Sequence, residues 1–150
     1  MALRQIRIND DEILRKKCRK VEEVNDHIRM ILDDMLDTLH NTENGAAIAA
    51  PQVGILKRIF VIDVYDGEGL RVFINPEILE TKGVQDGEEG CLSIPGISED
   101  VRRPNYVKVK ALNEKGEEFI LEAEELLARA ICHENDHLDG ILFIDHVKNN

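Results

Sequence analysis

The chain has 150 residues and a formal net charge of −11. Such an acidic surface repels phosphate backbones, and no long run of Lys and Arg offsets it, so we expect no direct binding to nucleic acid. No stretch of about 18 apolar residues occurs, which argues against a helix that spans a membrane.

The length suits one domain with an ordinary hydrophobic core, and we expect residues 1–150 to form a single unit. The cysteines, Cys18, Cys91 and Cys132, are an odd number, and the first residues lack the apolar stretch of a signal peptide. We therefore expect free thiols and a cytoplasmic protein. A basic segment at residues 15–20 is predicted to form the solvated face of a helix.

Two helices are predicted before the first strands. Asn9, Asp10 and Asp11 offer caps for a short helix that would run to about Val21. A second helix is predicted at residues 26–42, because apolar residues recur there at helical spacing and form a stripe for the core. The small, nearly uncharged residues 44–54 predict a buried turn between helix and sheet.

Strands then dominate the chain up to a last helix. Apolar and β-branched patterns predict strands at residues 57–64, 70–74, 77–81, 101–112 and 117–122. A tight turn is predicted at residues 66–67, a polar loop at 83–90 and a hairpin turn at 113–116. The absence of alternating strands and helices predicts an α+β fold with a mostly antiparallel sheet.

The last predicted helix begins near Glu124 and ends at Gly140, with a short strand expected at residues 141–144. It carries the pattern His-Glu-x-x-His at residues 133–137. Residues four apart share one helix face, so both imidazoles can reach one metal ion, and the glutamate between them can transfer a proton beside it. A histidine pair at this spacing can also be mere packing.

Catalytic centres of the zinc type need three protein ligands and one open position. One known continuation of the motif is H-x-x-G-x-x-H, but here Gly140 is present and Phe143 stands where the third ligand would be. Asp145 and His146 are weaker downstream candidates. The upstream thiol of Cys91 would give a sulfur and two nitrogen ligands, which suit Zn²⁺, Fe²⁺, Co²⁺ or Ni²⁺. Taken alone, a cysteine flanked by Gly, Leu and Ile is more typical of an inert buried thiol.

Three segments, in the right order, resemble the peptide deformylases. They read Gly-x-x-x-Ala-Ala-Pro-Gln at residues 45–52, Glu-Gly-Cys-Leu-Ser at 89–93 and His-Glu-x-Asp-His-Leu-x-Gly at 133–140. The resemblance covers essentially the whole chain. It implies a metal-dependent hydrolase that removes the N-formyl group from the formyl-methionine of newly made polypeptides near the ribosome, releasing formate.

The resemblance also implies roles for individual residues. Cys91, His133 and His137 would bind the metal, with Fe²⁺ as the native ion and Zn²⁺, Ni²⁺ or Co²⁺ as substitutes. Glu134 would take a proton from the attacking water and return it to the leaving nitrogen. Negative charge on the formyl oxygen would be stabilised by two further groups, the side-chain amide of Gln52 and the backbone N–H of Leu92.

Substrate-binding residues follow from the same resemblance. The peptide would lie extended beside residues 45–48, and its methionine would enter an apolar pocket. The residues expected to contact the substrate are Gly45, Ala46, Ala47, Ile48, Glu89, Gly90, Leu126, Arg129 and Ala130. Glu89 would also pair with Arg103 and brace the Cys91 loop, unless that pair is an ordinary surface ion pair.

Three positions depart from the family pattern. Ala47 stands where a glycine is usual, so its methyl group could crowd the peptide or forbid a positive φ. Cys132 stands where glutamine is common, and we expect it to pack rather than bind metal. Arg129 stands where an apolar pocket residue is expected, so it would either reach solvent over its stem or alter which second residue of the peptide is preferred.

Two rival functions remain open on the sequence alone. One is a metal-binding relative with little activity that serves as a peptide-binding module, which Ala47 motivates. The other is a metallopeptidase that cuts internal bonds, against which the absence of a ligand at Phe143 argues.

Overall fold

The computed structural model describes residues 3–42, 46–63 and 70–147, and the structural statements here concern these residues alone. Gly45 and the turn predicted at residues 66–67 lie outside them. Within the described ranges, no helix has the length and apolar character needed to cross a bilayer.

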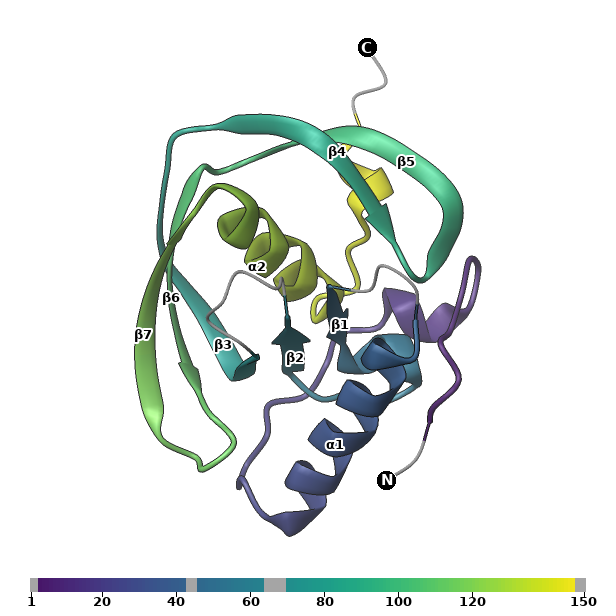
Figure 1. Ribbon diagram of the computed structural model, residues 1–150, viewed down its shortest axis with the longest axis vertical. Helices are drawn as coiled ribbons and strands as arrows, with labels where there is room; N and C mark the ends of the chain where they lie inside the picture. Colours follow the sequence, from purple (N-terminus) through teal and green to yellow (C-terminus); the bar gives the residue numbers. More distant parts are fainter. Residues whose placement is uncertain (1–2, 43–45, 64–69, 148–150) are drawn as a thin grey trace.

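Two antiparallel sheets enclose one helix, α2 (Glu125–His137) (Figure 1). The larger sheet has the strand order β1-β2-β3-β6-β7. Its strands are β1 (Ala47–Ala49), β2 (Ile59–Ile62), β3 (Arg71–Lys82), β6 (Tyr106–Leu112) and β7 (Glu118–Glu124). The smaller sheet is the hairpin of β4 (Gln85–Cys91) and β5 (Ile94–Arg103). The predicted α+β class with a mostly antiparallel sheet is confirmed.

The N-terminal helix α1 (Asp26–His40) confirms the second predicted helix, although it ends earlier than expected. The side chain of its N-cap, Asn25, accepts a hydrogen bond from the Ile28 N–H at 3.1 Å. Its apolar stripe packs against β1 and β2 and includes Ile28, Ile31, Leu32, Met35 and Leu39. This helix therefore supports the edge of the larger sheet at which β1 lies.

The first predicted helix is wrong, because only a single 3₁₀ turn, η1 (Glu12–Arg15), forms there. The chain after it is extended and its backbone groups bond to distant segments. The Cys18 N–H donates to the Leu138 carbonyl at 2.8 Å, and the Arg19 N–H donates to the Leu56 carbonyl at 3.0 Å. These bonds replace helical ones, so residues 15–20 are not a helix face.

Strand β3 joins the two strands predicted at residues 70–74 and 77–81. Its register shifts near Asn75, which has φ 52°. The Asn75 side chain accepts from the Val21 N–H and donates to the Val21 carbonyl, both at 2.8 Å. The irregularity therefore ties the N-terminal segment to the sheet.

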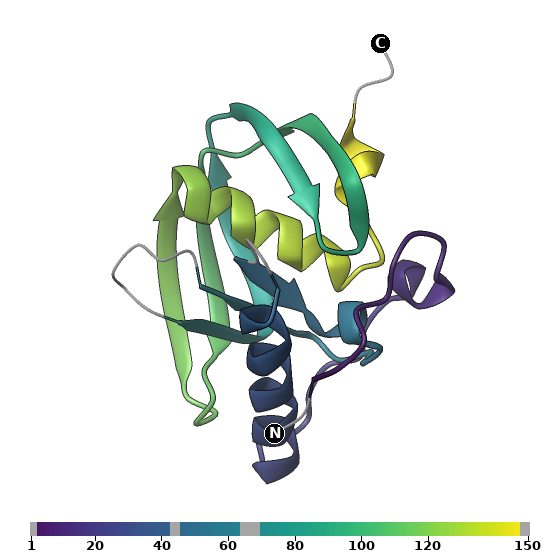
Figure 2. The same cartoon turned by 45° about the vertical axis from the view of Figure 1, so that its right-hand side comes forward.

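The loop predicted at residues 83–90 is wrong, because these residues contribute most of β4 and pair with β5. The buried positions of this hairpin are Glu89, Ile94, Val101 and Arg103. Two of the four carry charge, so the hairpin lacks the apolar alternation by which a strand is recognised from sequence. Figure 2 shows it on the side of α2 opposite the larger sheet.

The strand predicted at residues 101–112 is divided between β5 and β6. The break falls at Pro104 and Asn105, and proline cannot donate to a strand ladder. The predicted return strand is confirmed as β7. The strand predicted at residues 141–144 is wrong, because a 3₁₀ turn, η3 (Phe143–His146), buries Phe143 there.

Gly140 directs the chain away from α2. It has φ 75°, and a Cβ atom built on it would lie 2.4 Å from the Arg15 carbonyl oxygen. Only glycine fits this crossing, where the chain leaving α2 passes the N-terminal segment. The helix itself ends at His137, so Gly140 completes its exit turn.

Candidate metal centre

Three potential metal ligands converge between the hairpin and α2. Cys91 ends β4, while His133 and His137 lie one turn apart on α2. One ligand atom from each lies within 4.8 Å of the others, and Cys91 Sγ is 3.3 Å from His137 Nε2. Tetrahedral coordination at ordinary bond lengths separates ligand atoms by about 3.5 Å. The three donors therefore lie near the spacing that one divalent ion requires.

Glu89 orients His133 through the ring nitrogen that faces away from the metal position. Its Oε1 lies 2.8 Å from His133 Nδ1, which leaves Nε2 to face the metal position. Arg103 donates to both carboxylate oxygens at 2.9 Å, and its side chain is only 5% exposed, so this is no surface pair. Burial alone would raise the pKa of Glu89, but hydrogen bonds from His133 and Arg103 lower it to about 2.

The two histidines differ in protonation when no ion is bound. Burial opposes the charge on His133, but hydrogen bonds to Cys91 and Glu89 outweigh it and raise its pKa to about 10. Burial and the neighbouring charge of His133 lower the pKa of His137 to about 3. A metal binds only neutral imidazole, so a metal ion and a proton compete for His133.

Glu134 has the features of a general base. Its carboxylate is buried, and Oε1 has no hydrogen-bond partner in the described part of the chain. Its Oε2 lies 3.9 Å from His133 Nε2. Burial raises its pKa to about 7, with negative Glu89 adding to the rise and positive His133 opposing it. A carboxylate with this pKa can both accept and return a proton near neutral pH.

Gln52 is held in one orientation beside the ligands. It lies in the 3₁₀ turn η2 (Ala50–Val53), and its Oε1 accepts from the Ala49 N–H at 2.9 Å. Its Nε2 therefore points at Ser93 Oγ, 3.2 Å away, and Cys91 Sγ, 3.5 Å away. Ser93 was not among the predicted site residues, although it belongs to the Glu-Gly-Cys-Leu-Ser segment that carried the resemblance.

A cleft of about 630 Å³ opens over these groups. Most of the residues expected to contact the substrate line it, namely Ala46, Ala47, Glu89, Gly90, Leu126, Arg129 and Ala130. Leu92 also lines it, in the turn between β4 and β5. Ile48 does not, because its side chain is fully buried against α1. The predicted contact of Ile48 with an extended peptide would therefore come from its backbone, and it stays a prediction.

The departures from the family pattern have structural explanations. Ala47 lies in β1 and does not have a positive φ, so a glycine is not required there. Cys132 packs partly buried against the core, as expected, and burial raises the pKa of its thiol to about 11. Arg129 does not reach solvent, since its side chain is 8% exposed and it pairs with Glu89.

The downstream ligand candidates are engaged elsewhere. Asp145 accepts hydrogen bonds from Arg15, at 2.5 Å and 3.2 Å, and from the Leu142 N–H at 3.0 Å. His146 Nε2 lies 2.9 Å from Asp136 Oδ2 at the surface. The thiol of Cys91 is thus the group that the fold brings to the two histidines.

Known proteins resemble this chain in both sequence and fold. The polypeptide deformylase family model matches residues 3–150. Peptide deformylase 1 of Clostridium perfringens is 61% identical over 146 residues, which cover 97% of this chain and 99% of that protein. A peptide deformylase of Clostridium botulinum is 62% identical over 145 residues, covering 97% of each.

Solved structures of peptide deformylases have the same fold as this chain. A peptide deformylase from Thermotoga maritima superposes with a TM-score of 0.92 at 40% identity, covering 97% of this chain and 98% of that one. One from Synechococcus elongatus in complex with actinonin gives 0.93 at 41% identity, covering 98% and 80%. With this fold, relatives of 61% and 62% identity and a family match over nearly its whole length, the chain belongs to the polypeptide deformylase family.

Proposed function

We propose that the cleft hydrolyses the N-formyl group of amino-terminal formyl-methionine on newly made polypeptides and releases formate. The observation that carries this proposal is the pairing of a Cys-His-His ligand set with the buried carboxylate of Glu134 at one cleft, in a chain of this family. The whole chain would act as one catalytic domain, in the cytoplasm and close to the ribosome, where formylated chains emerge.

We assign Cys91, His133 and His137 as ligands of one divalent ion, Fe²⁺ in the cell, with Zn²⁺, Ni²⁺ or Co²⁺ as substitutes. A sulfur and two nitrogen donors suit all four ions. When bound, such an ion supplies a Lewis acid that polarises the formyl carbonyl and acidifies a water molecule.

Protein groups around the ion transfer the proton and stabilise the negative charge on the formyl oxygen. Glu134 accepts the proton of the attacking water, because its carboxylate lines the cleft and has an unpartnered oxygen, and then protonates the leaving nitrogen. The Gln52 amide, fixed by Ala49 and Ser93, donates to the formyl oxygen as negative charge develops. The backbone N–H of Leu92 is the second donor.

The peptide chain binds along β1. This strand is the edge of the larger sheet and pairs with β2 on one side only, so its other edge can receive an extended peptide. The backbone near Ala46 and Ala47 would supply these bonds, and neither residue has a side chain large enough to obstruct them. The methionine side chain would enter between Leu126 and Ala130 on α2.

Glu134→Ala tests the assignment. Formate release from a formyl-Met-Ala peptide is expected to fall by about 10²–10⁴-fold, the usual contribution of a general base. Metal content, measured on anaerobically prepared protein, is expected to stay at the wild-type level because no ligand is changed. Undiminished turnover would remove Glu134 from the mechanism, and cleavage of an unformylated peptide by the wild type would indicate a peptidase instead.

A further inference from the structure

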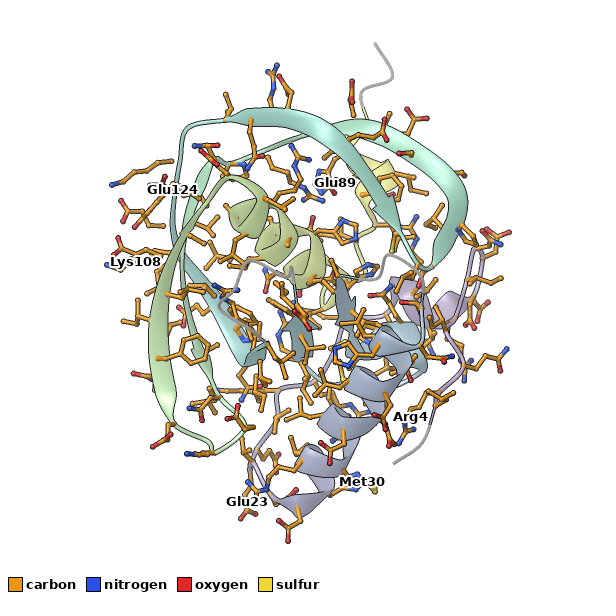
Figure 3. The ribbon with its side chains drawn as sticks, in the orientation of Figure 1. Arg4, Glu23, Met30, Glu89, Lys108 and Glu124 are labelled. Carbon is orange, nitrogen blue, oxygen red and sulfur yellow. The ribbon has the colours of Figure 1, made fainter. Side chains whose placement is uncertain are left out.

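The N-terminal segment at residues 4–9, which we call the strap, begins against α1. The backbone N–H of Arg4 donates to Thr38 Oγ1 at 2.9 Å, and its guanidinium pairs with Asp34 at 2.9 Å. Figure 3 shows Arg4 beside α1, and Figure 2 shows the segment running from there toward the tip of the β4–β5 hairpin. Ile6 packs against the core between α1 and the larger sheet. The strap is therefore anchored to the part of the molecule that carries the larger sheet.

Two backbone N–H groups of the strap reach the segments that carry the donors assigned to the formyl oxygen. The Arg7 N–H donates to the Gln52 carbonyl at 2.7 Å, and the Asn9 N–H donates to the Ser93 carbonyl at 2.8 Å. Gln52 supplies one donor through its side chain, and Leu92, one residue before Ser93, supplies the other through its backbone. Residues 4–9 do not line the cleft, so the strap can act on these donors only through the segments that carry them.

The side chains of Gln52 and Ser93 close a ring of hydrogen bonds with the strap. Gln52 Nε2 lies 3.2 Å from Ser93 Oγ, while the strap from Arg7 to Asn9 bridges the two carbonyl groups. Two residues of backbone span at most about 7 Å, so this bridge limits how far the carbonyls can separate. Gln52 is 1% exposed and Ser93 is 0% exposed, which shields the ring from water. The ring therefore fixes η2 relative to the turn of the hairpin.

The strap is held in one shape at both of its bonding residues. The Arg7 guanidinium lies against Gly54 at the end of η2, where a Cβ atom would come within 3.0 Å of its Nη2. Its Nη1 donates to Asp11 Oδ2 at 3.2 Å. Asn9 has φ 55°, which asparagine adopts more readily than most residues, and the Asp11 N–H donates across it to the Ile8 carbonyl at 3.2 Å.

We propose that the strap positions the two oxyanion donors relative to each other, and that the Asn9 N–H is the group through which it holds the Leu92 side of the pair. The inference rests on the proposed function, because that function assigns the Gln52 amide and the Leu92 N–H to the formyl oxygen. Donors placed for a developing charge lose their effect steeply when they move, and a displacement of about 1 Å can cost about 10²-fold in rate. Loss of one strap bond is expected to lower kcat by about tenfold with KM nearly unchanged, because the charge develops only in the transition state.

The Asn9 N–H can be removed without changing any side chain. Residues 1–17 are synthesised with an ester in place of the amide between Ile8 and Asn9, and are ligated to expressed residues 18–150 through the free Cys18. The ester puts an oxygen where the N–H donates to the Ser93 carbonyl. Formate release from formyl-Met-Ala by the Zn²⁺-loaded protein gives kcat and KM, with metal content and Tm measured beside them. The unmodified chain, assembled by the same ligation, is the reference.

An ester between Asp10 and Asp11 is the matched control. The test ester also weakens the Ile8 carbonyl as an acceptor for the Asp11 N–H, and the control removes that same bond while it keeps the Asn9 N–H. The control should retain kcat within about twofold of the reference, since its lost bond does not reach the ring. In a Gln52→Ala background, the Ile8–Asn9 ester should cost less than about twofold more, because one of the two donors is already gone.

A ¹⁵N label in residues 18–150 gives a readout that does not require turnover. The side-chain amide signals of Gln52 in the Zn²⁺-loaded protein should shift in the Ile8–Asn9 ester and not in the control, because the bond to Ser93 belongs to the ring. The proposal would be overturned by a reference-level kcat in the test ester, by an equal loss in the control, or by a full further loss in Gln52→Ala. A metal-loaded reference that releases no formate would instead count against the proposed function, and the Gln52 signals would still decide whether the strap positions that amide.

Discussion

Glu89 is the residue on which the other charged groups of the site depend. Its buried carboxylate receives hydrogen bonds from Arg103 and Arg129 and lies 2.8 Å from the imidazole of His133. A buried charge is tolerated only when its lone pairs are satisfied, and here three partners do so. The same contacts orient a metal ligand, so the ion network and the site cannot be changed independently.

The pH dependence of the reaction follows from Glu134. Its carboxylate must be unprotonated to accept a proton, so kcat/KM is expected to fall as the pH falls. Without an ion, its pKa is raised from 4.5 to about 7, and a cation held by the neighbouring histidines lowers it again. The midpoint of the acid limb should therefore lie between these two values.

The measurement is kcat/KM against pH with metal content determined at each point, because protonation of His133 would also release the ion. An acid limb that follows metal loss alone, or a midpoint below the ordinary glutamate value, would contradict the assignment of Glu134 as the base.

Ser93 is expected to act through Gln52. Its buried Oγ accepts one hydrogen of the Gln52 amide, which directs the other hydrogen toward the site. Loss of this bond in Ser93→Ala should lower kcat by about tenfold, the equivalent of about 1.4 kcal/mol, with little change in KM. Ser93→Thr, which keeps the hydroxyl, should restore the rate.

A double-mutant cycle distinguishes this role from a general structural one. In a Gln52→Ala background, Ser93→Ala should cause no further loss of kcat, because the amide that it positions is gone. Additive losses would show that Ser93 contributes independently of Gln52.

Helices and strands whose apolar residues recur at regular spacing could be predicted from the sequence. Those whose buried positions are polar could not. The helix α1, the strand pair β6–β7 and the helix α2 follow from their periodicity. The hairpin β4–β5 does not, because its inward positions include the paired charges Glu89 and Arg103. Such an ion pair can be recognised only when the positions of both residues in the fold are known.

The residues of the candidate site also differ in whether the sequence could predict them. Spacing on one helix predicted His133, His137 and Glu134. Cys91 lies on another element, so the residues alone made it a candidate beside the reading as an inert thiol, and the family resemblance was needed to choose between them. The role of Ser93 and the anchored conformation of Arg129 could not be predicted. Each depends on hydrogen bonds between elements whose relative placement the sequence does not specify.

One position on α2 conflicts with its helical pattern. Asn135 lies four residues after Ile131 and three before Leu138, both fully buried, and its Oδ1 is buried without a hydrogen-bond partner among the described residues. Such a group destabilises the fold by about 1–3 kcal/mol. Asn135→Leu is therefore expected to raise the free energy of unfolding by about 1 kcal/mol and Tm by about 2–4 °C.

Thermal unfolding of the metal-loaded protein measures this change. Asn135→Asp is the matched control, and it should lower Tm because it places a charge where the half-buried Asn135 has its buried Oδ1 atom. A lower Tm in Asn135→Leu would show that the amide is satisfied in solution.

At the scale of the whole molecule, the small hairpin is attached to α2 mainly by polar groups. Arg129 and His133 reach Glu89 on β4, and Asp136 pairs with Arg103 on β5 at 2.6 Å. Its apolar attachment is a small cluster in which Ile94 and Val101 pack with residues near η3. The larger sheet, by contrast, packs its apolar residues directly against both helices.

Metal removal should therefore destabilise the β4–β5 hairpin more than the larger sheet. Cys91 belongs to the hairpin and both histidines to α2, so an ion bound by all three cross-links them. An ion present at about 1,000 times its Kd stabilises the fold by about 4 kcal/mol, and its removal by a chelator should lower Tm by several degrees. Amide hydrogen exchange should become faster in β4 and β5 while β3 and β6 stay protected. Cys91→Ser, which weakens the cross-link, should show a smaller difference between the treated and untreated protein. Equal loss of protection in both sheets would mean that the ion stabilises the molecule as a unit and does not hold the hairpin in place.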